Sequence, residues 1–417
     1  MILPSSLRAL KYKNFRLYMW GQSISLVGTW MQRIAVSWLI YELTQSAFML
    51  GLVAFAGQIP ILILSPYAGA YVDRHSRYKT LLATQIASMA QAGVLALVAL
   101  TGYYNVTVII LLSIMLGVIN AFDAPSRQSL MSVMVREKKD LQNAIALNSS
   151  MVTLARLVGP AVAGILLSTV GEGICFLINF LSFIAVISSL LLMKITIPKR
   201  KKNIEPIWMN LRQGYIYLKR SPALKSVIFL MALVSLMIAP YATLFPVYAQ
   251  EIFNGDVTTF SWLNSISGLG ALMGAIYMTT LKTERKLLKI IAIAGLLLSA
   301  NLVLFSYTRN FPLALFFIML TEGGMLILIS ASNTYIQTHV EENMRGRVIS
   351  YFVMAFSGMQ PIGSLIVGAL AHVTSAPFTL LLEGIAGMVT ILLFIPAFKK
   401  TSKRAERKAK RMGMARL

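Results

Sequence analysis

Long apolar stretches recur along the whole chain, and each is long enough to cross a lipid bilayer. A transmembrane helix needs about 20 mostly apolar residues, and twelve such stretches occur among the 417 residues. The chain is 57% hydrophobic and 13% charged, whereas soluble domains carry about 25% charged residues for their polar surface. The sequence therefore predicts an all-α membrane protein with spans at 15–41, 46–71, 80–100, 106–124, 144–168, 173–194, 224–249, 258–281, 287–307, 312–334, 348–372 and 377–398.

The basic residues between these spans indicate the orientation. If the N-terminus lies in the cytoplasm, 35 of the 38 Lys and Arg residues fall in cytoplasmic segments, as the positive-inside rule requires. Both termini are therefore expected in the cytoplasm. The net charge of +23 then follows from topology and from attraction to anionic membrane lipids, so we expect no nucleic-acid partner, although the basic tail taken alone would also allow one.

A long polar stretch with three prolines divides the spans into two sets of six. The halves look like weak repeats, because Gly159-Pro160 in span 5 corresponds to Gln360-Pro361 in span 11. Two similar six-helix halves are typical of secondary transporters. The sequence thus predicts two pseudo-symmetric six-helix bundles, with an N-terminal bundle at 1–195, a cytoplasmic basic linker at 196–222, a C-terminal bundle at 223–398 and a basic cytoplasmic tail at 399–417.

The loop after span 2 contains the most specific motif. Residues 69–79 read Gly-Ala-Tyr-Val-Asp-Arg-His-Ser-Arg-Tyr-Lys, which resembles the signature loop of the major facilitator superfamily, with Ser76 in place of the second glycine. Gly69 would allow close helix approach, and Asp73 can cap a helix or pair with Arg77. The resemblance implies the major facilitator fold and a conformational latch on the cytoplasmic side, formed by Gly69, Asp73, Arg74, Arg77 and Asp123 opposite Arg347. Alternatively, the basic residues of this loop only set the topology.

Span 5 carries a second, weaker similarity to the superfamily. Gly159, Pro160 and Gly164 match the Gly-Pro element of its antiporter branches, and this element gives a flexible, closely packed helix. A kink without directional meaning is the alternative. No arginine lies within 111–122, where drug/proton antiporters often have one, and the segments 28–32, 43–46 and 123–127 look more like the siderophore exporters and macrolide-efflux proteins.

Four charged residues lie well inside the predicted spans, away from the span ends. Each costs about 2.5–3.5 kcal/mol to insert at the bilayer centre, and Glu322 and Arg156 lie nearest the midplane, while Arg33 and Glu383 lie closer to the outside. Burial favours proton uptake by a carboxylate, so Glu322 is the candidate for proton coupling, with a fixed salt bridge or strut as the alternative. Arg156 is expected to have a structural or anion-facing role.

Polar residues also form stripes along the helices. Such stripes either line a wet pathway or bond helices to one another, and we favour the pathway for span 1 because it carries the longest stripe. The predicted pathway residues are Gln22, Ser25, Thr29, Gln32, Arg33, Arg156 and Gln360.

These features favour a secondary active transporter over an enzyme. The three histidines and the single Cys175 are scattered, so we expect no metal site and no catalytic cluster, and no phosphate-binding loop for ATP is present. The leading hypothesis is a monomeric, proton-coupled exporter of a small amphipathic compound, drug-like or siderophore-like, that works by alternating access in the bacterial inner membrane without a cofactor. An importer, a lysophospholipid flippase and a non-transporting receptor or scaffold remain alternatives, and the sequence does not identify the substrate.

Overall fold

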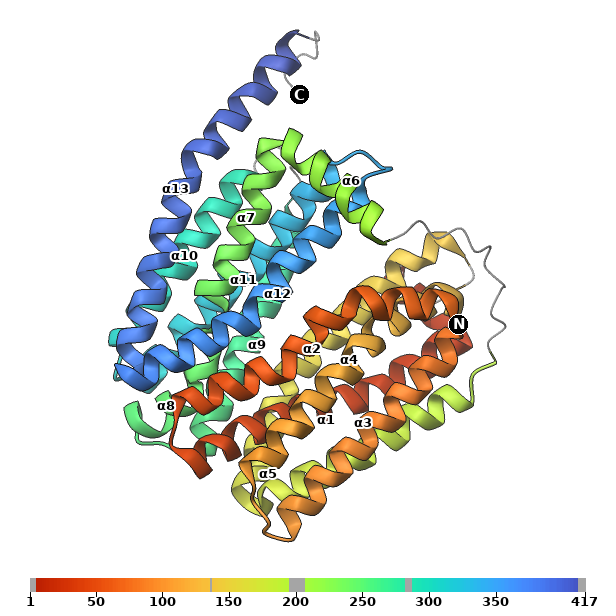
Figure 1. The fold of residues 1–417 in the computed structure, drawn as a ribbon, viewed down its shortest axis with the longest axis vertical. Coiled ribbons are helices and arrows are strands. Elements are labelled where there is room, and N and C mark those ends of the chain that lie inside the picture. The colour runs from red at the N-terminus through yellow and green to blue at the C-terminus, as the bar shows by residue number, and fades with distance from the viewer. Residues whose placement is uncertain (1–4, 136, 195–206, 282–286, 412–417) are drawn as a thin grey trace. The chain divides into compact units, whose positions relative to one another are not determined.

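The computed structural model describes residues 5–135, 137–194, 207–281 and 287–411 (Figure 1). Within these ranges the chain is almost entirely helical, and no strand is found. The chain divides into two compact units, one formed by Met1–Ile204 with Phe245–Gly268 and the other by Glu205–Leu244 with Leu269–Leu417. We describe each unit separately.

The first unit consists of long helices packed side by side. Helix α1 packs against α5, α3 against α4 and α5, and α2 against α4 (Figure 1). Gly171 interrupts α5 with a φ of 78°, a conformation that glycine adopts without steric cost, so α5 comprises two successive helices. The helices of this unit are η1 (Ser5–Lys11), α1 (Lys13–Thr44), α2 (Ala47–Arg74), α3 (Arg77–Leu100), α4 (Val106–Met134), α5 (Lys138–Leu191), α8 (Phe245–Val247), the π-helical turn η3 (Tyr248–Ile252) and the first half of α9 (Val257–Thr280).

Polar side chains begin several of these helices. The Ser46 hydroxyl accepts a hydrogen bond from the backbone of Met49, and Asn105 accepts from Thr107. Ser76 does the same for Lys79 at the start of α3. Such caps satisfy backbone N–H groups that the helix leaves unpaired, so the short connections define where α2, α3 and α4 start.

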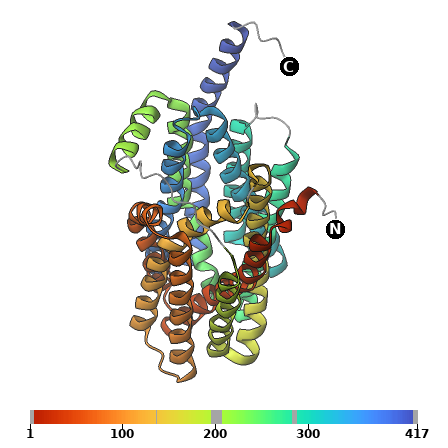
Figure 2. The ribbon, with the colours of Figure 1, turned by 90° about the vertical axis from the view of Figure 1, so that its right-hand side faces the viewer.

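The second unit contains the remaining half of α9 and six further α-helices. Helix α10 packs against α11 and α13, while α7 packs against α12 and α13. The last helix extends beyond the other helices of its unit (Figure 2). The helices are α6 (Ile207–Arg220), α7 (Pro222–Met237), η2 (Ala239–Leu244), α10 (Leu287–Tyr307), α11 (Phe311–His339), α12 (Arg345–Val373) and α13 (Ala376–Arg411).

The second unit adds detail to the predicted linker and differs from the sequence prediction in span 7. The linker lies outside the described residues as far as 206, and beyond that point it forms the amphipathic helix α6. Predicted span 7 is broken after Met237, where a 3-10 helix containing Pro240 replaces α-helix. Proline lacks the N–H that a regular helix would use there.

Nine of the described helices are long and apolar enough to cross a membrane. One of these is Lys139–Leu191, whose 53 residues are divided by Gly171 and are long enough for two of the predicted spans. The remaining predicted spans correspond to α1 and α9, in which polar side chains lower the apolar content. Each of the twelve predicted spans thus has its helical counterpart, and the all-α membrane class is confirmed.

Candidate functional site

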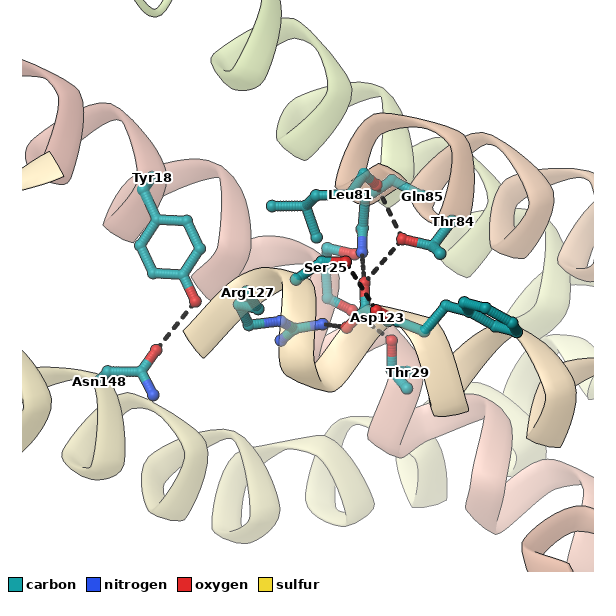
Figure 3. Close-up of polar contacts among 11 residues, drawn as sticks. Tyr18, Ser25, Thr29, Leu81, Thr84, Gln85, Asp123, Arg127 and Asn148 are labelled. Carbon is teal, nitrogen blue, oxygen red and sulfur yellow. Dashed lines mark hydrogen bonds and ion pairs between the residues drawn. The ribbon is translucent and has the colours of Figure 1, made fainter. Parts of the chain in front are cut away.

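Asp123 of α4 lies at the centre of a buried polar cluster in the first unit (Figure 3). It accepts hydrogen bonds from Gln85 Nε2 at 2.6 Å and from Thr84 Oγ1 at 3.1 Å, both on α3. Arg127, one helical turn further along α4, forms an ion pair with it. Asp123 is therefore paired with Arg127 and not with Arg77, which corrects the predicted Arg77–Asp123 contact. The spacing of four residues brings Asp123 and Arg127 to the same side of α4.

The remaining loop residues form a more exposed group at the end of α2. Arg77 Nη2 lies 3.9 Å from Asp73 Oδ1, and Arg77 Nη1 donates to the Ser129 carbonyl at 3.3 Å. Arg74 is exposed. A Cβ added to Gly69 would meet no atom within 4 Å, so the predicted close helix approach at this glycine is not found among the described residues.

Arg347, the predicted opposing residue of the latch, lies in the second unit near the start of α12. Its Nη1 donates to the Met344 sulfur at 3.3 Å, and its side chain lies against Gly214 of α6. Tyr351 fixes the same contact by donating to the Leu211 carbonyl at 3.0 Å. Helix α6 is thus anchored on α12, and a latch between the two predicted bundles remains a prediction.

Three of the predicted pathway residues on α1 are buried between helices. Gln32 donates to Gln91 Oε1 at 2.9 Å and accepts from Asn179 Nδ2 at 2.7 Å. Gln22 and Ser25 are each only 2% exposed. Side-chain hydrogen bonds of this kind hold membrane helices together, so the placement of Gln32 favours a structural role, joining α1 to α3 and α5, over a role in the pathway.

Arg33 lies against the ring of Trp30 on α1, whereas Thr29 lies beside Ser25, one turn earlier on the same helix (Figure 3). Thr29 donates to the Ser25 carbonyl at 2.8 Å within the helix. The Cζ atom of Arg33 lies 4.6 Å from the Trp30 ring centroid, and the Cζ atom of Arg156 lies 5.9 Å from the same ring. The structure thus brings together the two arginines that the sequence places within the spans.

The Gly-Pro element of α5 forms close helix contacts. A Cβ at Gly159 would lie 2.4 Å from Trp30 Cβ, and one at Gly164 would lie 2.6 Å from Ser261 Cβ. Pro160 is buried beside them. Small residues let the α5 backbone approach its neighbours at these points, as the sequence predicts, and a directional role of this element stays a prediction.

Glu322 of α11 is buried in the second unit, with 5% of its surface exposed. The Tyr241 hydroxyl donates to Glu322 Oε2 at 2.6 Å, and Tyr241 lies in η2, where the helix of predicted span 7 is broken. Gln360 is half-buried on α12. No sequence pattern connects Glu322 to Tyr241, which lies 81 positions earlier.

The sequence does not predict the hydrogen-bond surroundings of two further carboxylates, Glu383 and Glu251. Glu383 is 5% exposed, and neither of its side-chain oxygens has a hydrogen-bond partner among the described residues. Glu251 accepts a hydrogen bond from the Tyr41 hydroxyl within the first unit. Hydropathy predicts how deep Glu383 lies in the membrane, but it does not predict that Glu383 has no hydrogen-bond donor among the described residues. Nothing in the sequence predicts the hydrogen bond between Tyr41 and Glu251.

A charged group also ties the N-terminal helix η1 to the start of α5. Lys11 Nζ lies 2.7 Å from Asp140 Oδ2 and 3.1 Å from Glu137 Oε1, and Lys139 lies 2.7 Å from the other oxygen of Glu137. Hydrogen bonds from Lys139 and then Lys11 lower the pKa of Glu137 to about 2. The same carboxylates, Asp140 first, raise the pKa of Lys11.

The helices and buried polar groups of both units are those of a multi-pass membrane protein. Within the described residues, no three His, Cys, Asp or Glu side chains are grouped so that they could hold a metal ion. Buried polar groups instead join long helices, and ionisable side chains lie inside the spans. Residues 4–414 match the family model described as a transmembrane secretion effector. The chain belongs to this family of major facilitator transporters and is not an enzyme.

Known relatives extend over most of the chain. The staphyloferrin A transporter of Staphylococcus aureus (strain NCTC 8325 / PS 47) is 25% identical, covering 90% of this chain and 94% of its own length. Macrolide efflux protein A of Streptococcus pyogenes is 24% identical, covering 86% and 90%. The crystal structure of the nucleoside transporter NupG is similar in fold, with a TM-score of 0.72 at 14% identity, over 95% of this chain and 100% of that one.

Proposed function

We propose that the chain is a proton-coupled exporter that moves a small amphipathic compound, drug-like or siderophore-like, out of a bacterial cell. The observation that carries this proposal is the buried Glu322 carboxylate, which accepts a hydrogen bond from Tyr241 where predicted span 7 is broken. The secretion-effector family and the two relatives named for efflux and siderophore transport support export.

The geometry of Glu322 suits proton coupling. Ionisable groups inside spans mark proton and substrate routes in membrane proteins, and transporters place binding sites beside broken helices. A protonated Glu322 carries no charge, so its bond with Tyr241 changes as the proton binds and leaves. Each proton that enters the cell provides about 2.3 kcal/mol per 100 mV of membrane potential, and this energy would drive the substrate outward by alternating access.

Dye accumulation in inside-out vesicles, with and without a proton gradient, tests the proton coupling. With ethidium as the amphipathic probe, we expect wild-type vesicles to accumulate the dye only while a proton gradient is maintained. Glu322→Gln should lose this response while Glu341→Gln, which changes an exposed glutamate of the same unit, should keep it. Dye accumulation that persists after collapse of the gradient, in folded wild-type protein, would exclude proton coupling.

Glu383 is a second candidate for the coupling carboxylate, because both of its oxygens lack a donor among the described residues. A buried carboxylate without donors is unfavourable as an anion. Glu383→Gln therefore belongs in the same assay. If Glu383→Gln loses the proton response and Glu322→Gln retains it, the assignment moves to Glu383 and the exporter proposal stands.

The direction and setting of transport are part of the same proposal. We infer a bacterial inner-membrane location with both termini in the cytoplasm, since 35 of the 38 basic residues then lie inside, and a monomer in contact with anionic lipids. The division into bundles at 1–195 and 223–398 with a basic tail at 399–417 is proposed on the same grounds. Uptake into right-side-out rather than inside-out vesicles would instead indicate an importer, and movement of lysolipid would indicate a flippase.

A further inference from the structure

Helix α6 packs against the start of α12 through one of its faces. The Tyr351 hydroxyl donates to the Leu211 carbonyl at 3.0 Å, and the Tyr217 hydroxyl accepts from the Glu341 backbone N–H at 3.3 Å. Between these two hydrogen bonds, a Cβ added at Gly214 would lie 3.0 Å from Tyr351 Cε2. These contacts, about one helical turn apart, fix the rotation of α6 about its own axis, so the structure determines which of its side chains face outward.

The outward face of α6 combines apolar and basic side chains. At about 100° per residue, its exposed side chains lie within about 140° of arc, on the side of the helix largely opposite Gly214. No acidic residue occurs in the sequence of α6, so this face is positively charged. Its members are Met209, Arg212, Tyr215, Ile216, Lys219 and Arg220.

Neither water nor hydrocarbon suits this face. Met209, Tyr215 and Ile216 are 47%, 58% and 43% exposed, and apolar surface left in water is unfavourable. The basic side chains beside them would be costly in the hydrocarbon core. At the surface of a bilayer, apolar side chains reach the acyl chains while Lys and Arg side chains extend to the headgroups. The composition of this face is therefore typical of a helix that lies along a membrane surface.

The position of α6 in its unit agrees with such a location. Ser221 alone separates α6 from α7, which leads into the predicted span at 224–249. Tyr351, which donates to Leu211, lies about one turn inside the predicted span at 348–372. Figure 1 shows α6 at the end of the second unit where α7 and α12 begin. Helix α6 is therefore held at the boundary where both of these helices enter the bilayer.

We propose that the outward face of α6 binds the headgroups of anionic phospholipids in the surrounding bilayer, an inference that deepens the lipid contact proposed above. Lys and Arg side chains near an anionic membrane surface are attracted to it, and guanidinium groups donate charge-assisted hydrogen bonds to phosphate. The three apolar side chains of the face add to the binding by entering the region between headgroups and acyl chains. Lipid binding at this face is independent of the transported compound and of the coupling ion.

Quenching of a fluorescent label by spin-labelled lipids tests this contact in the purified full-length protein. Tyr215→Cys is made in a Cys175→Ala background, because Cys175 is the single cysteine, and is labelled with bimane. The protein is reconstituted in phosphatidylcholine vesicles that contain an equal fraction of either spin-labelled phosphatidylglycerol or spin-labelled phosphatidylcholine. We expect the phosphatidylglycerol to quench the label about twofold or more as effectively as the phosphatidylcholine. The double substitution Arg212→Gln/Lys219→Gln should bring this quenching ratio to about one.

Two further label positions calibrate the quenching. Leu393 lies in an apolar segment of α13 and is 72% exposed, so a label at Leu393→Cys reports lipid contact. Glu342 is exposed in the connection between α11 and α12, so a label at Glu342→Cys reports water. Only variants that elute as a single species with wild-type helix content are compared, and Met209→Cys on the same face replaces Tyr215→Cys if that variant does not fold.

The matched charge control is Lys289→Gln/Arg309→Gln, which removes one exposed lysine and one exposed arginine at the two ends of α10 and should leave the quenching ratio unchanged. The proposal is wrong if the Tyr215→Cys label is quenched no more than the Glu342→Cys label, because the outward face then contacts water or a soluble protein. It is also wrong if Arg212→Gln/Lys219→Gln lowers the ratio no more than the control does. Lipid quenching and proton-driven dye accumulation are separate measurements, so failure of one proposal is distinguishable from failure of the other.

Discussion

The buried Asp123–Arg127 pair allows a quantitative test of the structure. Asp123 is 5% exposed and has three donors, namely Thr84, Gln85 and Arg127. Among the described residues, Arg127→Met removes the only charged donor to Asp123 and leaves the carboxylate with two neutral donors. Breaking a buried ion pair from one side costs about 3–5 kcal/mol, and since two hydrogen bonds remain, we expect a loss near the lower end, about 3 kcal/mol.

A double-mutant cycle separates the ion pair from its surroundings. Asp123→Asn should also destabilise the protein, because it leaves the Arg127 guanidinium with no carboxylate in a site where its side chain is 19% exposed. The double variant Asp123→Asn/Arg127→Met removes both charges. We therefore expect it to recover about 1–3 kcal/mol relative to the sum of the single variants, as coupled neighbours do.

The free energies of unfolding of these variants can be measured by reversible unfolding in micelles that contain a mild detergent and dodecyl sulfate. The helix content reports the extent of unfolding. The matched control is Asp73→Asn, which breaks a pair of the same residue types and spacing, Asp73–Arg77, in which the aspartate side chain is 43% exposed. Exposed pairs contribute about 0–1 kcal/mol. The buried pair does not stabilise the protein as inferred if the stability losses of the two single variants sum to that of the double variant within about 0.5 kcal/mol. The same conclusion follows if Asp73→Asn lowers the free energy of unfolding as much as Arg127→Met does.

Two further predictions concern other parts of the first unit. Hydrogen bonds from Lys139 and Lys11 lower the pKa of Glu137 to about 2. The contribution of Glu137 to stability is therefore complete above the ordinary glutamate pKa of about 4.3 and is lost as the pH falls toward 2. In Glu137→Gln, the thermal unfolding midpoint should fall less across this pH window than in the wild type. Gly159→Ala should destabilise by about 1–3 kcal/mol through overpacking against Trp30, whereas Gly69→Ala, with open space for its Cβ, should be neutral or stabilising by up to about 1 kcal/mol in the same unfolding assay.

The helical fold could be predicted because the bilayer constrains it strongly. Each span must be long and apolar, and these properties are visible in the sequence whatever the helix contacts. The break in predicted span 7 was missed because the surrounding residues, from Pro222 to Ile252, remain strongly apolar throughout. Pro240 was the available signal. The end of α5's first helix at Gly171 lies within the gap predicted between spans 5 and 6.

Side-chain partners were harder to predict than helices. Asp123 and Arg127 are four residues apart, and this spacing places both on one side of a helix. The resemblance instead implied Arg77 as the partner of Asp123. Gln32 and its partners Gln91 and Asn179 come from three different helices. A polar stripe on one helix is compatible with both a wet pathway and a bonded interface, and only the neighbouring helices decide between them.

The same limit applies to the two buried glutamates of the second unit. Hydropathy placed Glu322 near the midplane and Glu383 closer to the outside, which made Glu322 the candidate for coupling. The structure leaves both 5% exposed, and it gives Glu322 a donor in Tyr241 while Glu383 has none among the described residues. Depth in the membrane therefore does not rank the two carboxylates. Glu322 thus differs from Glu383 in its hydrogen-bond donor and not in its burial, and the Glu322→Gln and Glu383→Gln variants in the vesicle assay decide which of the two couples transport to protons.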